Sequence, residues 1–397
     1  MRLGRFTRRA GLRAGLSAAL AAPLGREAAL AAATAGAAQE QPAVGAGLGI
    51  AAAAAIARQP SRSGRAAAGA AIGIATRAVW AVASKEPAAV APHRVWTGLD
   101  PAPDGTGLGI VVNPGAGTGT SAEDPAEVLR TELPGAEVVV LDDPSQLGDE
   151  LERLARSGVR ALGVAGGDGS INSAAAVALD HRLPLAVVPA GTLNHLARDL
   201  GVETVDDTIE AIRKGNAIEV DVARIDGRPF LNTASFGSYT EIVDAREQLQ
   251  DRLGKWPAVA VAVARVLRHG TSAEVSIDGE RQELWAVFIG NCRYEPAGMA
   301  PTWRSRLDDG QLDVRVADAA HPFSRTRLVL AAATGRLHRS PVFRTWVTTN
   351  IHVKSLDGPL RLAHDGETFD GPSAFDITKT GERLAIYAPR PAEPPSV

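Results

Sequence analysis

Two short apolar runs, each ending in a glycine-containing loop, constrain the fold of this chain most strongly. Residues 161–165 run into Gly166-Gly167-Asp168-Gly169-Ser170, and residues 183–188 run into Pro189-Ala190-Gly191-Thr192. Uncharged runs of this length next to glycines predict buried strands. A helix is expected after each loop, the first running from Ile171 to Leu179 with Ser170 as its cap. Two such units in succession place both loops at the carboxyl edge of a parallel sheet.

The two loops are suited to binding phosphate. Adjacent glycines let the backbone approach a ligand with no Cβ in the way, and a helix start offers unpaired N–H groups and a positive dipole end. The loops lack the Gly-Lys-Ser/Thr ending of a P-loop and the Gly-x-Gly-x-x-Gly pattern of dinucleotide sites. Nucleotide binding would therefore depend on backbone donors, hydroxyl groups and Asp168. The alternative is that both loops are ordinary turns between a strand and a helix.

Alternating strand and helix patterns predict an open α/β sheet over residues 108–222. Its first strand is Leu108–Val112, and residues 136–141 form the next, followed by a helix over 146–156 that Ser145 caps. Residues 223–390 hold many short strands with Gly, Pro and Asp turns, which predicts a second, β-sandwich-like domain. The strands expected there are 273–277, 283–291, 311–316, 347–356, 360–363, 374–378 and 384–388.

The N-terminal part differs from the rest in charge. Residues 1–95 carry 12 lysines and arginines against 3 acidic residues, while the remainder carries 30 against 42. We expect an Ala/Arg-rich helical extension over 1–83, a linker with prolines and glycines over 84–107, and a tail over 391–397. The uncharged runs of the extension fall short of the ~20 apolar residues that span a membrane. Its charge suits contact with anionic lipid or with RNA, and the alternative is a poorly ordered leader. We expect peripheral contact with a membrane and no nucleic-acid partner.

The glycine loops carry a family resemblance. Gly166–Ser170 together with Pro189–Asn194 resembles the catalytic domain of diacylglycerol kinases and bacterial lipid kinases, a group that includes sphingosine kinases, and the likeness covers residues 108–390. It implies a Rossmann-like domain of the NAD kinase and diacylglycerol kinase type, a β-rich second domain, and ATP- and Mg²⁺-dependent phosphorylation of a lipid hydroxyl such as that of diacylglycerol. The residues implied in binding the nucleotide are Asn113, Gly166, Gly167, Asp168, Gly169, Ser170, Asn172, Gly191, Thr192, Asn194 and Arg198.

The resemblance also implies two magnesium sites. Asp168 and Asp221 would hold the magnesium of the nucleotide through water, which suits an ion that retains several waters. The segment around Asp309 resembles the structural magnesium loop of the family, with further ligands from the carbonyl groups of Arg306 and Gln311. The alternatives are a surface residue at a strand edge for Asp221 and a common Asp-Gly turn for the loop.

The triplet Asp365-Gly366-Glu367 is the candidate catalytic motif. Phosphoryl transfer needs the acceptor hydroxyl positioned in line and relieved of its proton, and a carboxylate within hydrogen-bond reach can take that proton. By resemblance Asp365 is the general base and Glu367 an assisting acid, both facing the nucleotide from the second domain. The alternative is a tight turn with two solvated acids. The adjoining His364 is expected to have no role.

The chain departs from the family pattern at two places. His195 stands where many relatives have an aspartate, and Thr118, Thr120 and Ser121 follow Asn113 where a lysine or arginine is usual. These differences leave open a non-catalytic protein that binds nucleotide or lipid. A second alternative is a kinase of the NAD kinase type that acts on a water-soluble substrate, which the Pro189–Asn194 loop and the Asp365–Glu367 triplet disfavour.

Further expectations concern the remaining segments. Residues 58–62 resemble the last helix of a PAP2-type phosphatase, but Arg58 and Arg62 replace its histidine and aspartate, so no phosphatase activity is expected. Lipid access is expected near the apolar helix around Val259–Leu267, and an unpaired sheet edge in the second domain would permit a homodimer. The single cysteine, Cys292, excludes a disulfide framework and fits a cytoplasmic protein that works at the inner face of the membrane. The acceptor lipid is not identified.

Overall fold

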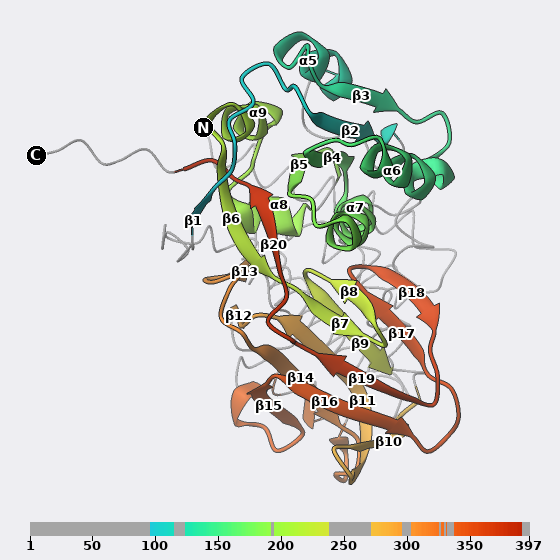
Figure 1. Ribbon diagram of the computed structural model, residues 1–397. Coiled ribbons are helices and arrows are strands. Elements are labelled where there is room, and N and C mark those ends of the chain that lie inside the picture. Colours follow the sequence, from blue (N-terminus) through green and yellow to red (C-terminus); the bar gives the residue numbers. More distant parts are fainter. Residues whose placement is uncertain are drawn as a thin grey trace, which may run out of the picture.

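The described part of the chain forms two large sheets, one in an α/β unit and one in a β-rich unit, and a small two-stranded ribbon (Figure 1). The computed structural model describes residues 96–114, 124–191, 194–237, 271–295, 303–324, 327–328, 331 and 337–390. The predicted N-terminal extension with its PAP2-like segment, the threonines after Asn113, Thr192, the helix around Val259–Leu267 and the C-terminal tail lie outside these residues. Among the described residues, no helix is both long and apolar enough to cross a membrane.

The first sheet has seven strands in the order β1-β6-β20-β5-β4-β2-β3. They are β1 (Trp96–Gly98), β2 (Leu108–Val112), β3 (Glu137–Val140), β4 (Ala161–Gly166), β5 (Leu185–Pro189), β6 (Asn216–Asp221) and β20 (Arg383–Tyr387). Strands β2 to β5 are parallel, β20 is parallel to β5, and β6 and β1 are antiparallel to their neighbours. The α/β fold class predicted from the pattern is therefore confirmed, with the first parallel strand at its predicted bounds.

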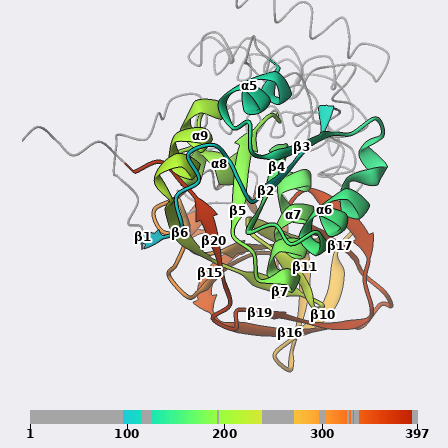
Figure 2. The same cartoon turned by 45° about the horizontal axis from the view of Figure 1, so that its top comes forward.

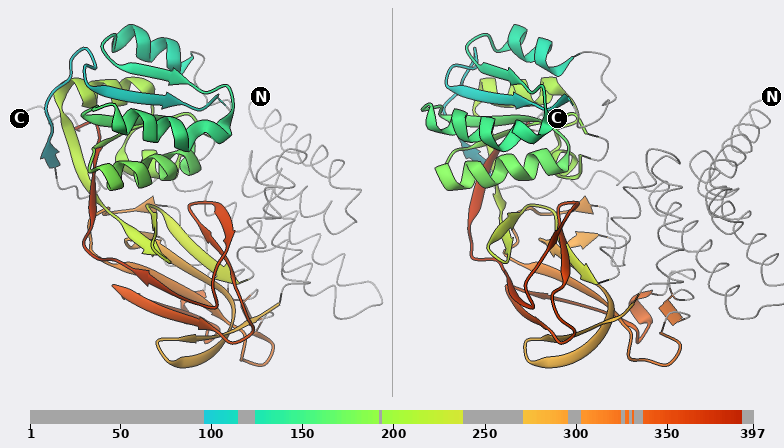
Figure 3. Two further views of the ribbon diagram at one scale, coloured as in Figure 1. Left: turned by 45° about the vertical axis from the view of Figure 1, so that its right-hand side comes forward. Right: turned by 90° about the vertical axis from the view of Figure 1, so that its right-hand side faces the viewer.

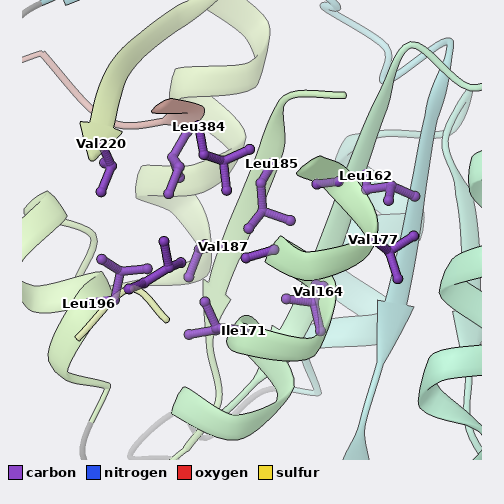
Figure 4. Packing of buried hydrophobic residues seen from close by; sticks show 14 of the residues in the cluster. Leu162, Val164, Ile171, Val177, Leu185, Val187, Leu196, Val220 and Leu384 are labelled. Carbon is purple, nitrogen blue, oxygen red and sulfur yellow. The ribbon is translucent and has the colours of Figure 1, made fainter. Parts of the chain in front are cut away.

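Helices cover both faces of this sheet (Figure 2). One face carries α5 (Pro125–Glu132) and α9 (Val205–Lys214), and the other carries α6 (Leu147–Arg156), α7 (Asp168–His181) and α8 (His195–Leu200). In Figure 4, Ile171 of α7 and Leu196 of α8 point into the same apolar core as Val164 and Val187 of the sheet. Burying one such side chain stabilises the fold by roughly 1.5–3 kcal/mol. This packing holds the N-terminal ends of α7 and α8 beside the strand ends.

The second sheet is antiparallel and strongly curled, as predicted for a β-sandwich-like domain. Nine strands follow the order β18-β17-β9-β11-β10-β16-β19-β7-β8, and β14 joins β11 to β15. These are β7 (Ala223–Ile225), β8 (Arg228–Phe230), β9 (Thr233–Gly237), β10 (Ala273–Ile277), β11 (Glu280–Asn291), β14 (Leu312–Asp318), β15 (Phe343–Thr348), β16 (Asn350–Ser355), β17 (Arg361–His364), β18 (Glu367–Asp370) and β19 (Ala374–Thr378). The register between β11 and β14 shifts between Leu284 and Ala286, and β11 also pairs with β10 and β9 at successive stretches of its length. A small ribbon, β12 (Tyr294–Glu295) with β13 (Trp303–Arg304), stands apart from both sheets.

Two predicted domain limits need correction. Residues 96–98, predicted as linker, form β1 on β6, and Trp96 packs against the core of the α/β unit. Residues 383–387, predicted to belong to the second domain, return to the first sheet as β20, between β6 and β5. Figure 3 shows β6 and β20 running between the two units. Alternation of side chains identifies a strand, but it does not show which sheet the strand joins.

Local boundaries also differ from the pattern. The strand predicted over 347–356 is divided into β15 and β16, which have different neighbours. Asp143, not Ser145, caps the 3₁₀ turn (Pro144–Gln146) before α6, because its carboxylate accepts a hydrogen bond from the Ser145 N–H. Asp and Ser are both common N-cap residues, so the sequence alone does not show which of the two caps a helix. The position of the 3₁₀ turn makes Asp143 the cap here.

Candidate active site

The two glycine loops lie side by side at the carboxyl ends of β4 and β5. Gly166 is paired with Pro189, and a Cβ added to Gly191 would lie 2.4 Å from the Gly167 Cα. Only glycine allows backbones to approach so closely. Asn194 holds the second loop in shape, since its side chain accepts a hydrogen bond from the Gly191 N–H at 3.0 Å and donates one to the Gly191 carbonyl at 2.8 Å.

A third strand end joins these loops. Asn113, which follows β2, donates a hydrogen bond from Nδ2 to the Ser170 Oγ at 3.0 Å. Helix α7 begins at Asp168 with Gly167 as its N-cap, so Ser170 lies in the first turn instead of capping a helix at Ile171. The first N–H groups of a helix have no partner within it, and the helix dipole there favours an anion. The three strand ends thus surround the start of α7.

Asp168 connects α7 to α8 and to the β-rich unit. Its half-buried carboxylate accepts hydrogen bonds from the backbone N–H groups of His195 at 3.3 Å and Leu196 at 3.4 Å. The Asn232 side chain donates to it at 3.5 Å. These contacts are long for hydrogen bonds to a charged group. The carboxylate therefore retains capacity to accept a further ligand.

Asp365 is buried and held by backbone donors. It stands in the two-residue turn between β17 and β18, where Asp365 and Gly366 both have positive φ, at 46° and 92°. An Asp-Gly pair is typical of this hairpin turn. Its carboxylate accepts hydrogen bonds at 2.8 Å from the backbone N–H groups of Leu231, Asn232 and Thr233. The predicted turn is present, but its aspartate is 6% exposed and is not solvated.

The surroundings of Asp365 raise its pKa to about 6. Burial is the largest cause, because it disfavours the charged carboxylate, and the negative charge of Asp168 adds to it. The three backbone N–H groups act in the opposite direction. Asn232 contacts both predicted aspartates, since its backbone N–H donates to the Asp365 Oδ1 at 2.8 Å and its side chain donates to the Asp168 Oδ1 at 3.5 Å. The two carboxylates, one from each unit, therefore lie on either side of one residue.

Asn172 and His364 link the two units beside Asp365. In the orientation that satisfies its neighbours, the Asn172 amide donates to the Asp365 Oδ2 at 3.0 Å and to the Pro229 carbonyl at 3.2 Å. Its oxygen then accepts from the His364 Nδ1 at 3.1 Å. Burial lowers the pKa of His364, with Arg228 adding to the effect, so the surroundings favour the neutral imidazole. His364 therefore has a contact that the sequence did not predict.

Glu367 approaches the start of α7 from the β-rich unit. A Cβ added to Gly169 would lie 2.8 Å from the Glu367 Oε1. Glu367 is exposed and is the first residue of β18, so it follows Asp365 around the hairpin turn. The structure thus brings the predicted catalytic pair to the glycine loop that contains Asp168.

Comparison with known proteins agrees with this arrangement. The model of the diacylglycerol kinase catalytic domain matches residues 107–225, and the model of the YegS C-terminal NAD kinase beta sandwich-like domain matches residues 235–380. The chain belongs to the diacylglycerol kinase family. The resemblance predicted from the glycine loops is confirmed, and this family member is a lipid kinase.

Individual relatives are distant in sequence. A diacylglycerol kinase from Staphylococcus carnosus is 24% identical over 251 residues, which cover 61% of this chain and 80% of the relative. One from Bacillus subtilis is 28% identical over 214 residues, covering 51% and 69%. The solved structure of a candidate diacylglycerol kinase from Bacillus anthracis has a TM-score of 0.53 at 21% identity and covers 72% of this chain and 98% of that one. The last comparison shows that the fold is shared.

Arg304 of this lipid kinase is a site residue that sequence reasoning missed. It is 1% exposed, and its Nε forms an ion pair with Asp199 of α8 at 2.7 Å. Its Nη2 donates to the Asn232 Oδ1 at 2.9 Å, which fixes the amide that contacts Asp168. No motif surrounds Arg304 in the sequence, so only the fold reveals its position. Asp199, which lies four residues after His195, is directed toward Arg304.

Arg198 and His195 have different positions on α8. Arg198 is exposed on the helix, and its contact with phosphate or a lipid headgroup stays a prediction. His195 donates its backbone N–H to Asp168. The replacement of an aspartate by His195 therefore leaves that backbone contact intact.

The residues predicted to hold a structural magnesium do not fit that ion. The Gln311 carbonyl accepts a hydrogen bond from the Lys379 Nζ at 3.0 Å, and the Asp309 Oδ1 lies 3.7 Å from the same ammonium group. The Arg306 side chain pairs with Asp308. A positive charge already stands beside the Asp309 carboxylate and the Gln311 carbonyl, so these two groups do not fit the predicted ion. The role of the Arg306 carbonyl stays a prediction.

Asp221 is likewise occupied. Its buried carboxylate lies 3.1 Å from the Lys379 Nζ and 3.3 Å from the Arg383 Nε, and it accepts a hydrogen bond from the Gly310 N–H at 2.7 Å. Among the described residues, Asp221 and Asp168 share no hydrogen-bond partner. The geometry does not support a joint magnesium site of Asp168 and Asp221, because two cations neutralise Asp221.

Proposed function

We propose that this lipid kinase transfers the γ-phosphoryl group of ATP to the hydroxyl group of a membrane lipid such as diacylglycerol, with Asp365 as the general base. The observation that carries the proposal is the buried Asp365 carboxylate, whose pKa is raised to about 6, beside Asp168 and the glycine loops. A base with a pKa near the working pH is ionised often enough to act and is basic enough to accept a proton.

The hydrogen bonds of Asp365 define where the lipid hydroxyl would bind. A carboxylate has about four lone-pair positions. The Asn232 and Thr233 N–H groups occupy both positions on Oδ1, the Leu231 N–H occupies one on Oδ2, and the Asn172 amide occupies the other. The acceptor hydroxyl displaces the Asn172 amide and donates to Oδ2. Asp365 takes the proton, the lipid oxygen forms a bond to the γ-phosphorus, and the bond between this phosphorus and the β–γ bridging oxygen breaks to release ADP.

The nucleotide would bind at the three strand ends. Backbone N–H groups of the Gly166–Gly169 loop and the start of α7 are suited to the phosphates, and Ser170 with Asn113 adds polar side chains. Asp168 fits as the carboxylate that reaches Mg²⁺ through water, since its hydrogen bonds are long and no described lysine or arginine forms an ion pair with it. When bound, Mg²⁺ neutralises charge on the phosphates. Asn194 and Gly191 act by keeping the second loop in shape.

The proposed enzyme works at a membrane surface, because its lipid acceptor carries an acyl tail. Residues 1–95 have a net positive charge, which attracts anionic lipid to the protein. Contact at the inner face of the cytoplasmic membrane follows from this charge and from the use of ATP.

The test uses labelled ATP, Mg²⁺ and mixed micelles that contain diacylglycerol, ceramide, a sphingoid base or a polyprenol, followed by separation of the lipids. Labelled phosphate in one lipid class with wild-type protein, and its loss in Asp365→Asn, is the expected result. Asp376→Asn is the matched control, because Asp376 is exposed and pairs with the exposed His352. In a parallel reaction, NAD replaces the lipid micelles and no detergent is added. Formation of labelled NADP in that reaction, or binding of ATP with no labelled product in either reaction, would contradict the proposal.

A further inference from the structure

The Lys379 ammonium group is buried among four acceptors from three parts of the chain. Its Nζ lies 3.0 Å from the Gln311 carbonyl, 3.0 Å from the Cys292 Sγ, 3.1 Å from the Asp221 Oδ2 and 3.7 Å from the Asp309 Oδ1. The side chain of Lys379 is 1% exposed. We refer to these five residues as the Lys379 cluster.

The acceptors match the donors of an ammonium group. Lysine has three N–H donors, and three acceptors lie at 3.0–3.1 Å, with the Asp309 carboxylate as a fourth, longer neighbour. A buried ammonium is costly unless it is paired and hydrogen-bonded. Lys379 meets both conditions, which explains why the long side chain is buried.

Without the lysine, the same acceptors would resemble a cation site. The ligand atoms of Asp221, Cys292 and Asp309 all lie within 4.8 Å of one another. Two carboxylates and a carbonyl oxygen are ligands that Ca²⁺ and Mg²⁺ prefer.

The cluster also joins the two units. Asp221 is the last residue of β6 in the first sheet, Asp309 and Gln311 precede β14 in the second sheet, and Lys379 follows β19 where the chain returns to β20. A positive charge at this point holds together three segments that are distant in sequence.

We propose that Lys379 is a built-in cation that takes the position of a divalent metal between Asp221, Asp309 and the Gln311 carbonyl, so that the junction of the two units needs no bound ion. Loss of the lysine leaves two buried carboxylates beside a carbonyl oxygen. The cluster then becomes a site for a hard divalent cation.

Thermal unfolding of the full chain tests the proposal. The wild-type midpoint is expected to be the same in EDTA, Mg²⁺ and Ca²⁺. The midpoint of Lys379→Ala is expected to fall by roughly 5–10 °C in EDTA and to rise again with Mg²⁺ or Ca²⁺, with one ion bound per chain by titration calorimetry. Lys354→Ala is the matched control, because Lys354 is exposed on β16; it should show neither the loss nor the recovery.

Two further measurements decide the case where Lys379→Ala does not fold. Lys379→Met keeps the length of the side chain, and adding Asp309→Asn to it removes one of the uncompensated charges, so the double variant should be more stable than Lys379→Met. Elemental analysis of the wild-type protein could instead find one tightly held divalent ion per chain, and EDTA could lower the wild-type midpoint but not that of Asp309→Asn. Those two results together would overturn the proposal. A double variant no more stable than Lys379→Met would also overturn it.

Discussion

The Asp365 cluster, made of Asp365, Asp168, Asn232, Asn172 and His364, and the Lys379 cluster both contain two aspartates at the junction of the two units. Their surroundings differ. Asp221 in the Lys379 cluster faces two cations, Lys379 and Arg383. No described lysine or arginine forms an ion pair with Asp365 or Asp168, and backbone N–H groups and amides surround them instead.

The difference between the two clusters shows that a buried aspartate can either hold structure or exchange a proton. A carboxylate paired with a buried cation has a fixed charge and holds structure. A buried carboxylate that is stabilised only by neutral donors keeps a raised pKa and can exchange a proton near neutral pH. Five predictions test the two clusters and the loops beside them.

The largest effect is expected from replacing one aspartate in each cluster. Asp365→Asn should lower kcat by about 10²–10⁴-fold, the usual contribution of a general base. Asp309→Asn should leave kcat close to that of the wild type, because Asp309 is assigned no part in phosphoryl transfer. Steady-state kinetics with labelled ATP and mixed micelles, with circular dichroism to verify folding, measures both. Equal losses in two folded variants would remove the distinction between the clusters.

The next effect is on stability. Asp221→Asn should lower the free energy of unfolding by about 3 kcal/mol, the lower end of the range for breaking a buried ion pair, because Asp309 still faces the lysine. Urea denaturation followed by tryptophan fluorescence gives this value. Asp376→Asn serves as the exposed control. A change of under about 0.5 kcal/mol, typical of a surface substitution, would show that the buried pairing is not needed.

Two glycines beside the Asp365 cluster should respond unequally to alanine. In Gly191→Ala the new Cβ would meet the Gly167 backbone at 2.4 Å, so a loss of roughly 1–3 kcal/mol is expected. In Gly169→Ala the Cβ would meet the end of the Glu367 side chain at 2.8 Å, which can rotate away. We therefore expect Gly169→Ala to unfold near the wild-type urea midpoint. The reverse order would contradict the close approach of the two loops.

The smallest effect is a dependence on pH. Since Asp365 has a pKa of about 6, above the ordinary 3.8, kcat/KM should fall about tenfold per pH unit below pH 6 as the base becomes protonated. Asn172→Ala removes a donor to the charged form and should move this fall to higher pH. The rate profile of the wild type between about pH 5 and pH 8 checks the first statement. A flat profile would argue against Asp365 as the base.

The stability of the protein should change in the opposite sense over the same range. The folded pKa of Asp365 lies above its unfolded value. The stabilisation from its protonated form is therefore fully present below pH 3.8 and is lost as the pH rises through about 6. Comparing the urea midpoints of wild type and Asp365→Asn across this range isolates the contribution of Asp365.

The sequence by itself determined the features that depend on neighbouring residues. Apolar runs that end at glycines predicted β4 and β5 and the loops at their carboxyl ends, and the Asp-Gly pair predicted the turn that carries Asp365. These features follow from backbone geometry and burial over a few residues, which a local pattern records.

Only the tertiary structure decided how the charges are balanced and which strands share a sheet. Lys379 lies 158 residues after Asp221 in the chain, and Arg304 lies 105 residues after Asp199, yet each pair is in contact. Strand β20 has an ordinary alternating pattern but joins the first sheet. A carboxylate in the sequence has the same charge whatever surrounds it. Whether it holds a metal, accepts a proton or pairs with a lysine depends on groups that folding brings to it from distant segments.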